Sequence, residues 1–192
     1  MMSLVWPIPL RPRWWLAAMR GRDGAPSPRT RTDAATGQFE AFFRRYEPEL
    51  TGYLWRMTGD TETAHDLCQE TFTRAWQRYA HIAGYAQPRQ WLYRVATNLA
   101  LNLRRRLPTA TLDDHDPAMS DPTGHVVERE QVRQILAELA PKPRAILILR
   151  EVQQFSYAEI GALVGMSPDA VKMAVSRARA QFRQRYLTQE HD

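Results

Sequence analysis

The sequence has little of what disulfide-linked, metal-binding or membrane-spanning proteins require. Its 192 residues include one cysteine, Cys68, which excludes an intramolecular disulfide and a zinc site built from several cysteines. The five histidines are scattered, and no two of them stand at metal-ligand spacing. No stretch approaches the roughly 20 apolar residues that cross a bilayer, and the apolar run at 14–19 is too short for the core of a signal peptide. We therefore expect a soluble, cytoplasmic protein without a metal or other cofactor.

Motifs that carry enzyme chemistry are also missing. There is no glycine-rich loop of the kind that binds phosphate. The carboxylates that stand close together fall in an acidic stretch at 108–127, or on one face of a predicted helix that carries Asp66 and Glu70. We therefore expect that the protein is not an enzyme.

Charge is present, and it is distributed unevenly along the chain. The net charge of +5 comprises +4 over residues 1–37, +3 over 38–107, −4 over 108–127 and +2 over 128–192. The acidic stretch has too few apolar residues to bury, so we interpret it as a flexible linker between two basic blocks. The sequence pI of about 9.7 fits a polyanionic partner, although the basic N-terminal segment alone also explains most of the excess.

Residues 1–37 show no helical period and contain five prolines. We expect this segment to be a largely disordered basic extension. Two interpretations stay open, because such an arm either adds non-specific affinity for DNA or has no role.

Residues 38–107 are predicted to form three helices. Apolar residues recur at three- and four-residue steps as far as Met57, which predicts an amphipathic helix that ends at Gly59. A second helix begins near Thr61. Pro88 suits the first turn of a third helix, because proline lacks only a backbone donor that would be unsatisfied there. The outer faces of the second and third helices carry Asp66, Gln69, Glu70, Arg94, Asn98, Asn102 and Arg105.

Residues 128–187 are also predicted to be helical. Pro141 and Pro143 break the chain after a first apolar stripe, and a nearly all-apolar helix then runs from Ala145 to Val152. With 44% hydrophobic residues overall, the chain can bury such a helix in a packed core.

A helix-turn-helix pattern follows. Ser156 begins a capping box, Gly165 suits a left-handed helix end, and Ser167 caps the next helix. A generic helical hairpin explains these caps. It does not require Gly161, Gly165 and Val171 together with a cationic outer face on the last helix, a combination that resembles the DNA-binding helix-turn-helix.

Three segments extend this pattern to a family resemblance: AHDLCQETF at 64–72, WLYRVATNLALN at 91–102 and SYAEIGALVGMSPDAVKMAVSRAR at 156–179. With them the chain resembles the bacterial extracytoplasmic-function (ECF) sigma factors. The resemblance implies an all-α fold of two small helical domains. These are a region-two helical bundle at 38–107 and a region-four helix-turn-helix at 128–187, joined by the acidic linker.

The resemblance also implies roles for the region-two residues. The second helix would bind the clamp of the largest subunit of core RNA polymerase, although an ordinary solvated acidic face is the simpler explanation of that helix alone. The matching positions are Asp66, Gln69 and Glu70. The third helix would melt the promoter and capture bases of the minus-ten element, next to a base-specificity loop at 81–87. The matching positions are Arg94, Asn98, Asn102, Arg104 and Arg105.

The last helix would read the minus-35 element, and here the chain departs from the common family pattern. The positions that the resemblance assigns to this site are Tyr157, Lys172, Met173, Ser176, Arg177 and Arg179. Met173 and Ala174 replace polar residues, so we expect the element to be atypical or weakly read. Implied partners are core RNA polymerase, through its clamp and flap, and promoter DNA; whether an anti-sigma factor exists is left open. Cys68 replaces an aliphatic residue and is interpreted as a small buried hydrophobe, with a redox switch as the alternative.

Two other functions use part of these features. A stand-alone helix-turn-helix regulator leaves residues 38–107 without a task. A polymerase-binding adaptor without promoter specificity uses Asp66 and Glu70 but has no need of Lys172 and Arg177.

Overall fold

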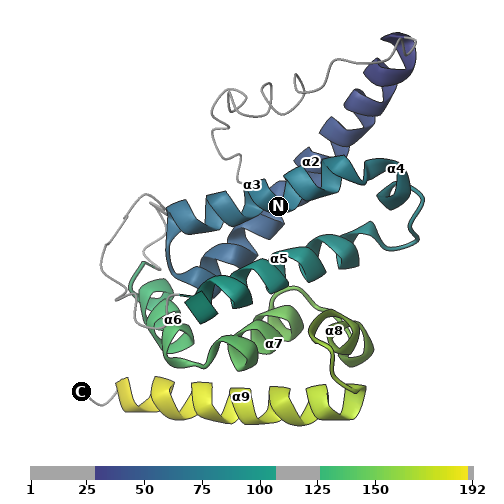
Figure 1. The fold of residues 1–192 in the computed structure, drawn as a ribbon. Coiled ribbons are helices and arrows are strands. Elements are labelled where there is room, and N and C mark those ends of the chain that lie inside the picture. Colours follow the sequence, from purple (N-terminus) through teal and green to yellow (C-terminus); the bar gives the residue numbers. More distant parts are fainter. Residues whose placement is uncertain (1–28, 107–125, 190–192) are drawn as a thin grey trace, which may run out of the picture. The chain divides into compact units, whose positions relative to one another are not determined.

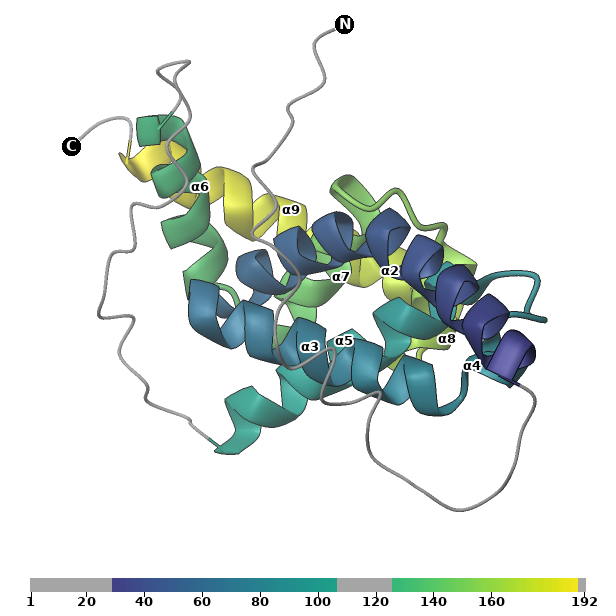
Figure 2. The same ribbon diagram turned by 90° about the horizontal axis from the view of Figure 1, so that it is seen from above.

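The computed structural model describes residues 29–106 and 126–189 (Figures 1 and 2). No strand occurs within these residues, which confirms the expected all-α fold. The helices are α2 (Arg29–Thr58), α3 (Thr61–Gln77), α4 (Tyr79–Ile82), α5 (Pro88–Arg106), α6 (Val126–Glu138), α7 (Pro141–Glu151), α8 (Tyr157–Val164) and α9 (Pro168–Gln189). We refer to α2–α5 as the first block and to α6–α9 as the second block. The predicted linker lies almost wholly outside the described residues, as does most of the predicted N-terminal extension.

The first block is held together by aromatic rings and by a buried pair of hydroxyl groups. The Phe39 ring packs edge-on against those of Phe72 and Trp76, with centroids 6.5 and 4.9 Å away. The hydroxyl oxygens of Tyr53 on α2 and Thr97 on α5 are 2.8 Å apart, and both residues are fully buried. α3 and α5 run alongside each other (Figures 1 and 2). Their inner faces are thereby occupied, which leaves the polar outer faces to the solvent.

Three helix boundaries differ from the sequence-based expectation. α2 begins at Arg29 rather than near Phe39, because the only strong breaker between them is a glycine, which costs a helix about 1 kcal/mol. α4 is a short helix that includes the first two residues of the predicted loop at 81–87. α7 includes Pro141 and Pro143, which lie in its first turn, where a missing backbone N–H costs nothing.

The predicted caps of α8 and α9 are confirmed. The Glu159 amide donates to Ser156 Oγ at 3.2 Å, and the Ser156 amide donates back to Glu159 Oε2 at 2.7 Å. These hydrogen bonds hold the pKa of Glu159 below its usual range. Gln90 Nε2 of α5 also donates to Glu159 Oε1, at 3.1 Å. At the start of α9 the Ala170 amide donates to Ser167 Oγ at 3.2 Å.

The two glycines of the helix-turn-helix have the roles predicted for them. Gly165 ends α8 with φ of 68°, the left-handed region. A Cβ on Gly161 would lie 2.5 Å from the carbonyl oxygen of Met166, so only glycine allows α8 to approach this turn. Val171, at the corner, is completely buried. The turn between α8 and α9 is thus tightly constrained.

One buried arginine joins the two blocks. Arg144, in the first turn of α7, is 1% exposed. Its Nη1 donates to the Met57 carbonyl in the last turn of α2, at 2.8 Å. Its Nη2 donates to the carbonyls of Ala137 and Leu139 at the end of α6. Carbonyls at helix C-termini lack partners within their own helix and carry the negative end of the helix dipole, so a guanidinium suits them.

A second set of contacts joins α5 to the turn between α7 and α8. The Tyr93 hydroxyl donates to Gln153 Oε1 at 2.5 Å, and Arg89 Nη2 donates to both oxygens of Gln153 at 3.1 Å. The Arg89 guanidinium lies 4.4 and 4.9 Å from the ring centroids of Phe155 and Tyr93. We call these four residues the interblock contact. With Arg144, they join the first block from Phe39 onward to the second block in one compact unit.

Arg144→Met should lower the free energy of unfolding by about 3 kcal/mol. The thioether fills similar space but leaves two buried carbonyls and the half-buried one of Ala137 without donors, at roughly 1–3 kcal/mol for each buried group. Part of this cost is offset because a charge is no longer buried. Urea unfolding followed by circular dichroism measures the change. The matched control, Arg183→Met on the exposed face of α9, should stay within about 0.5 kcal/mol of the wild type. Equal stabilities for the two variants would contradict this role of Arg144.

Candidate nucleic-acid interface

The outer face of α9 presents cations that the protein does not use internally. Val171, Val175 and Ala178 are buried against the rest of the second block, so the opposite face is exposed. Within the described residues, Lys172 and Arg177 have no hydrogen bond or ion pair and are exposed. Such cations are available to phosphates or to base edges.

Arg179 differs from these two cations. Its guanidinium forms two hydrogen bonds with Glu151 Oε1 of α7, at 2.9 and 2.7 Å. Arg185 is similarly paired with Glu138, at 2.6 Å. A nucleic-acid contact by Arg179 would therefore compete with this pair, which the sequence did not predict.

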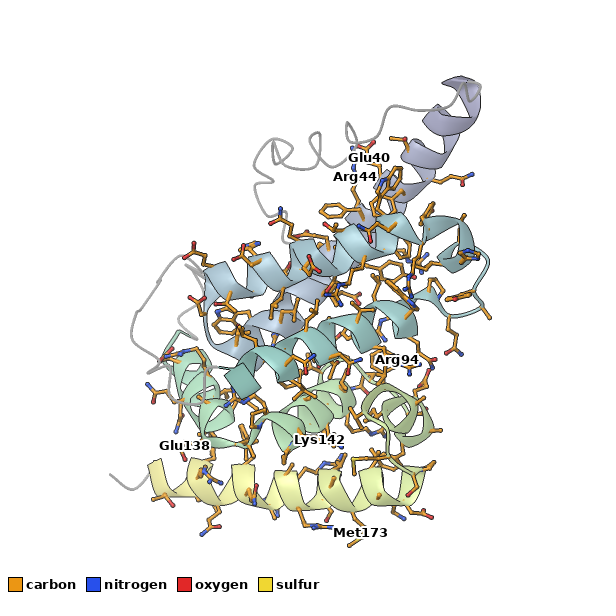
Figure 3. The ribbon with its side chains drawn as sticks, in the orientation of Figure 1. Glu40, Arg44, Arg94, Glu138, Lys142 and Met173 are labelled. Atoms are coloured by element: carbon orange, nitrogen blue, oxygen red, sulfur yellow. The ribbon has the colours of Figure 1, made fainter. Side chains whose placement is uncertain are left out.

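The remaining candidates near α9 occupy different positions. Tyr157 is half-buried at the start of α8, with the Arg150 guanidinium 4.8 Å from its ring centroid. Ser176 is exposed on α9. Met173 is 55% exposed and points away from α7 and α8 (Figure 3). The structure thus brings Met173 and Ser176 to the exposed face and leaves Tyr157 beside it.

The outer face of α5 carries a row of polar side chains. Arg94, Asn98 and Asn102 stand four residues apart and are all exposed, whereas Tyr93 and Thr97 are buried on the inner face. Amides exposed in this way have free donors and acceptors for the edges of unpaired bases. The side chains of Arg104 and Arg105, at the end of α5, lie outside the described ones.

Sequence reasoning missed one candidate beside α5. Tyr85, in the loop before α5, is 49% exposed. An exposed aromatic ring is a surface on which an unpaired base can stack. Its position next to Gly84, as the one aromatic residue of the predicted loop at 81–87, was the available signal.

The acidic face of α3 has the predicted exposure at two of its three positions. Asp66 and Glu70 are exposed, and Gln69 is half-buried. Glu70 forms an ion pair with Arg74 at 2.7 Å. An exposed pair of this kind contributes little to stability, so the face is available to a partner.

Cys68 is buried, as the hydrophobe interpretation requires. Its side chain is 4% exposed, and Thr51 Oγ1 donates to its sulfur at 3.2 Å. Burial raises the pKa of the thiol to about 12. Redox chemistry starts from the thiolate, so this environment does not favour a redox switch.

Two further properties concern the described residues only. No group of three or more His, Cys, Asp or Glu side chains there could hold a metal ion. None of the helices described is both long enough and apolar enough to span a membrane.

Comparisons with known proteins agree with the division into blocks. Residues 42–108 match the family model of Sigma-70 region 2, and residues 129–182 match that of Sigma-70 region 4. The chain is 35% identical to the ECF RNA polymerase sigma factor SigG of Mycobacterium tuberculosis, over 87% of this chain and 52% of SigG. It therefore spans about half the length of that relative.

A shorter relative is covered almost entirely. The identity to the RNA polymerase sigma factor YlaC of Bacillus subtilis is 34%, over 75% of this chain and 89% of YlaC. Among solved structures, the fold is similar to that of the sigma factor RpoE, crystallised with the anti-sigma factor NepR from Bartonella quintana. That match has a TM-score of 0.65 at 21% identity and covers 77% of this chain and 96% of RpoE.

The Cys68 thiol should react with iodoacetamide at pH 8 at least about 1,000-fold more slowly in the folded protein than in urea. A pKa of about 12 leaves only about one thiol in ten thousand ionised at that pH, and burial also blocks access. Mass spectrometry of timed samples measures the rate. The folded rate should increase with pH as far as the fold survives. A folded rate close to that in urea would show a reactive thiol and restore the redox hypothesis.

Proposed function

The chain belongs to the ECF RNA polymerase sigma factors, and on that premise we propose that it directs core RNA polymerase to specific promoters. The observation that carries the proposal is the presence of two separate polar faces suited to nucleic acid in one chain. One is the cationic face of α9, and the other is the amide row of α5. As a partner of RNA polymerase, the protein would act in the cytoplasm.

The α5 face suits the minus-ten element. Unpaired bases are held by stacking and by hydrogen bonds to their edges. We propose that Asn98 and Asn102 supply the hydrogen bonds and that Tyr85 supplies a stacking surface. Arg94, with Arg104 and Arg105 beyond the described side chains, would contact phosphates.

The α9 face suits the minus-35 element in duplex form. In a helix-turn-helix the N-terminal half of the second helix contacts base edges in the major groove. Lys172 and Arg177 are five residues apart, about 140° around the helix, so each would contact a different base or phosphate. Ser176 and Tyr157 would contribute hydroxyl groups, and Arg179 would contribute only after leaving Glu151.

The acidic face of α3 suits core RNA polymerase. We propose that Asp66, Gln69 and Glu70 contact the clamp of the largest subunit, and that the second block contacts the flap. The RpoE structure contains an anti-sigma factor, so we propose such a regulator as a further partner to be sought by co-purification.

Reading both elements at once requires the two blocks to separate. The elements lie about 25 base pairs apart, which is roughly 85 Å of B-form DNA. In the compact arrangement, Gln90 contacts Glu159, and the path from Asn102 through this contact to Lys172 is under about 60 Å even if fully straight. We therefore propose that the interblock contact and the Arg144 contacts with Met57 break when the protein engages polymerase and promoter. The linker of residues 108–127 could extend to about 65 Å.

Run-off transcription tests the proposed function directly. The purified chain is added to bacterial core polymerase on fragmented genomic DNA from its host, and the transcripts are sequenced. We expect discrete start sites that share two upstream elements. A stand-alone regulator would bind DNA without core polymerase and start no transcripts. An adaptor would bind polymerase without fixed start sites, so either result would contradict the proposal.

Asp66→Ala combined with Glu70→Ala should weaken binding to core polymerase at least tenfold while the fold stays intact. Both side chains are exposed on α3, so the fold does not depend on them. Fluorescence anisotropy with labelled protein measures the affinity. The control combines Glu40→Ala with Glu138→Ala, which removes the same charge away from α3, together with the ion pairs of Glu40 with Arg44 and of Glu138 with Arg185. If the control lost as much affinity as the test variant, net charge would explain the effect.

Asn98→Ala combined with Asn102→Ala should impair open-complex formation on a duplex promoter at least tenfold. The defect should be smaller on a template already mismatched at the minus-ten element, because the mismatch removes the cost of unpairing. Permanganate footprinting of unpaired thymines measures both. Gln77→Ala, an exposed amide on α3, is the control and should behave as the wild type. Equal defects on both templates would show that these amides do not act in promoter melting.

A further inference from the structure

An apolar strip, formed by exposed Met173 and half-buried Ala170 and Ala174, borders the exposed face of α9. Ala170, Met173 and Ala174 lie three and four residues apart, so they form one continuous strip along the helix. The strip borders a surface pocket of about 460 Å³, whose wall is completed by Pro143 and Met166. Arg177 and Gln181 continue the same wall toward the C-terminal end of α9, where it becomes polar.

Met173 lies at the outermost point of this strip. It is about 200° around the helix from Val171, which is fully buried. Figure 3 shows its side chain pointing away from the second block. When the N-terminal half of α9 enters a major groove, Met173 is therefore directed at the base edges rather than at the sides of the groove.

The chemistry of the strip excludes a phosphate as its main contact. Ala170, Met173 and Ala174 have no donor for a phosphate oxygen, and the Asp169 carboxylate at the start of the strip repels one. The cations Lys172 and Arg177 lie on either side of Met173, about 100° and 40° around the helix from it. Cations that flank an apolar centre fit a DNA groove, in which phosphates border the base edges, better than they fit an apolar peptide.

The major-groove edge of DNA offers one apolar group, the C5-methyl of thymine. We propose that the strip reads thymine methyl groups in the minus-35 element, with Met173 as the principal contact. This inference rests on the proposed function, and it adds the base that this part of α9 prefers. The flexible, polarisable thioether of Met173 adapts to a methyl group without a fixed geometry.

The expected preference for thymine over a base without the methyl group is modest. Burying one methyl-sized group is worth about 0.8 kcal/mol, which corresponds to about a fourfold change in affinity. A bidentate hydrogen-bonded contact discriminates more strongly. An element read mainly through methyl groups is therefore a weakly read one, in keeping with the loss of two polar groups at Met173 and Ala174.

Replacing thymine with deoxyuracil isolates the methyl group, because the pairing hydrogen bonds do not change. The binding duplex is first selected from a random pool with the full chain bound to core polymerase. Each thymine of the minus-35 element is then replaced in turn, and affinities are measured by competition. For the wild type we expect one or two positions at which the replacement weakens binding about fourfold.

Variants assign the effect to the strip. In Met173→Ala the sensitive positions should lose most of their response to deoxyuracil. Leu187→Ala is the matched control, because Leu187 is 50% exposed on the same helix but lies outside the strip, and it should keep the full response. If deoxyuracil had no effect at any position, or an equal effect in wild type and Met173→Ala, the inference would be overturned and the proposed function would stand. If selection enriched no sequence, both would fail.

Discussion

The arrangement of the two blocks depends on a buried positive charge placed where two helices end. α2 and α6 each finish with carbonyl groups that have no partner in their own helix, and both helix dipoles point their negative ends at the same place. Arg144 fills this position with a planar group of five donors. Since Arg144 belongs to the first turn of α7, it fixes the start of the helix that carries α8 and α9. A lysine has the charge but not the planar group of donors, so it cannot reproduce this arrangement of hydrogen bonds.

The interblock contact extends this junction along α5. Burial raises the pKa of the Tyr93 hydroxyl, so the proton that it donates to Gln153 is retained at physiological pH. Arg89 is held between the Tyr93 and Phe155 rings while it donates to Gln153, which combines a cation–π contact with hydrogen bonds. Gln153 and Phe155 belong to the second block, so their contacts with Arg89 and Tyr93 are lost on separation, and only the Arg89–Tyr93 contact within α5 can remain. A partner that separates the blocks must therefore bind the separated form more tightly than the compact form, by at least the free energy that these contacts contribute.

The parts of the fold that depend on neighbouring residues could be predicted from the sequence. The capping box at Ser156 and the left-handed end at Gly165 need only residues a few positions away. The exposure of Asn98 and Asn102 follows from their position opposite the apolar stripe of the third predicted helix, which includes Leu92. The exposure of the faces proposed to bind DNA and polymerase is therefore largely determined by local sequence.

Long-range pairs could not be predicted in this way. The pairing of Arg144 with Met57 joins residues 87 positions apart, and that of Tyr93 with Gln153 joins residues 60 apart. Burying a charge is costly unless hydrogen-bond partners satisfy it, and the carbonyls that satisfy Arg144 belong to the ends of two other helices. The ion pair of Arg179 with Glu151 could not be predicted for the same reason, because the two residues are 28 positions apart.

The distance between the two blocks tests their proposed separation most directly. Fluorophores at Gln77→Cys on α3 and Gln184→Cys on α9, in a Cys68→Ser background, would report the distance between the blocks by single-molecule energy transfer. The free protein should show one short distance. Binding to core polymerase and promoter should lengthen it clearly, because the span of the two elements exceeds the reach of the compact form from Asn102 to Lys172 by about 25 Å. An unchanged distance in a complex that transcribes would contradict the account.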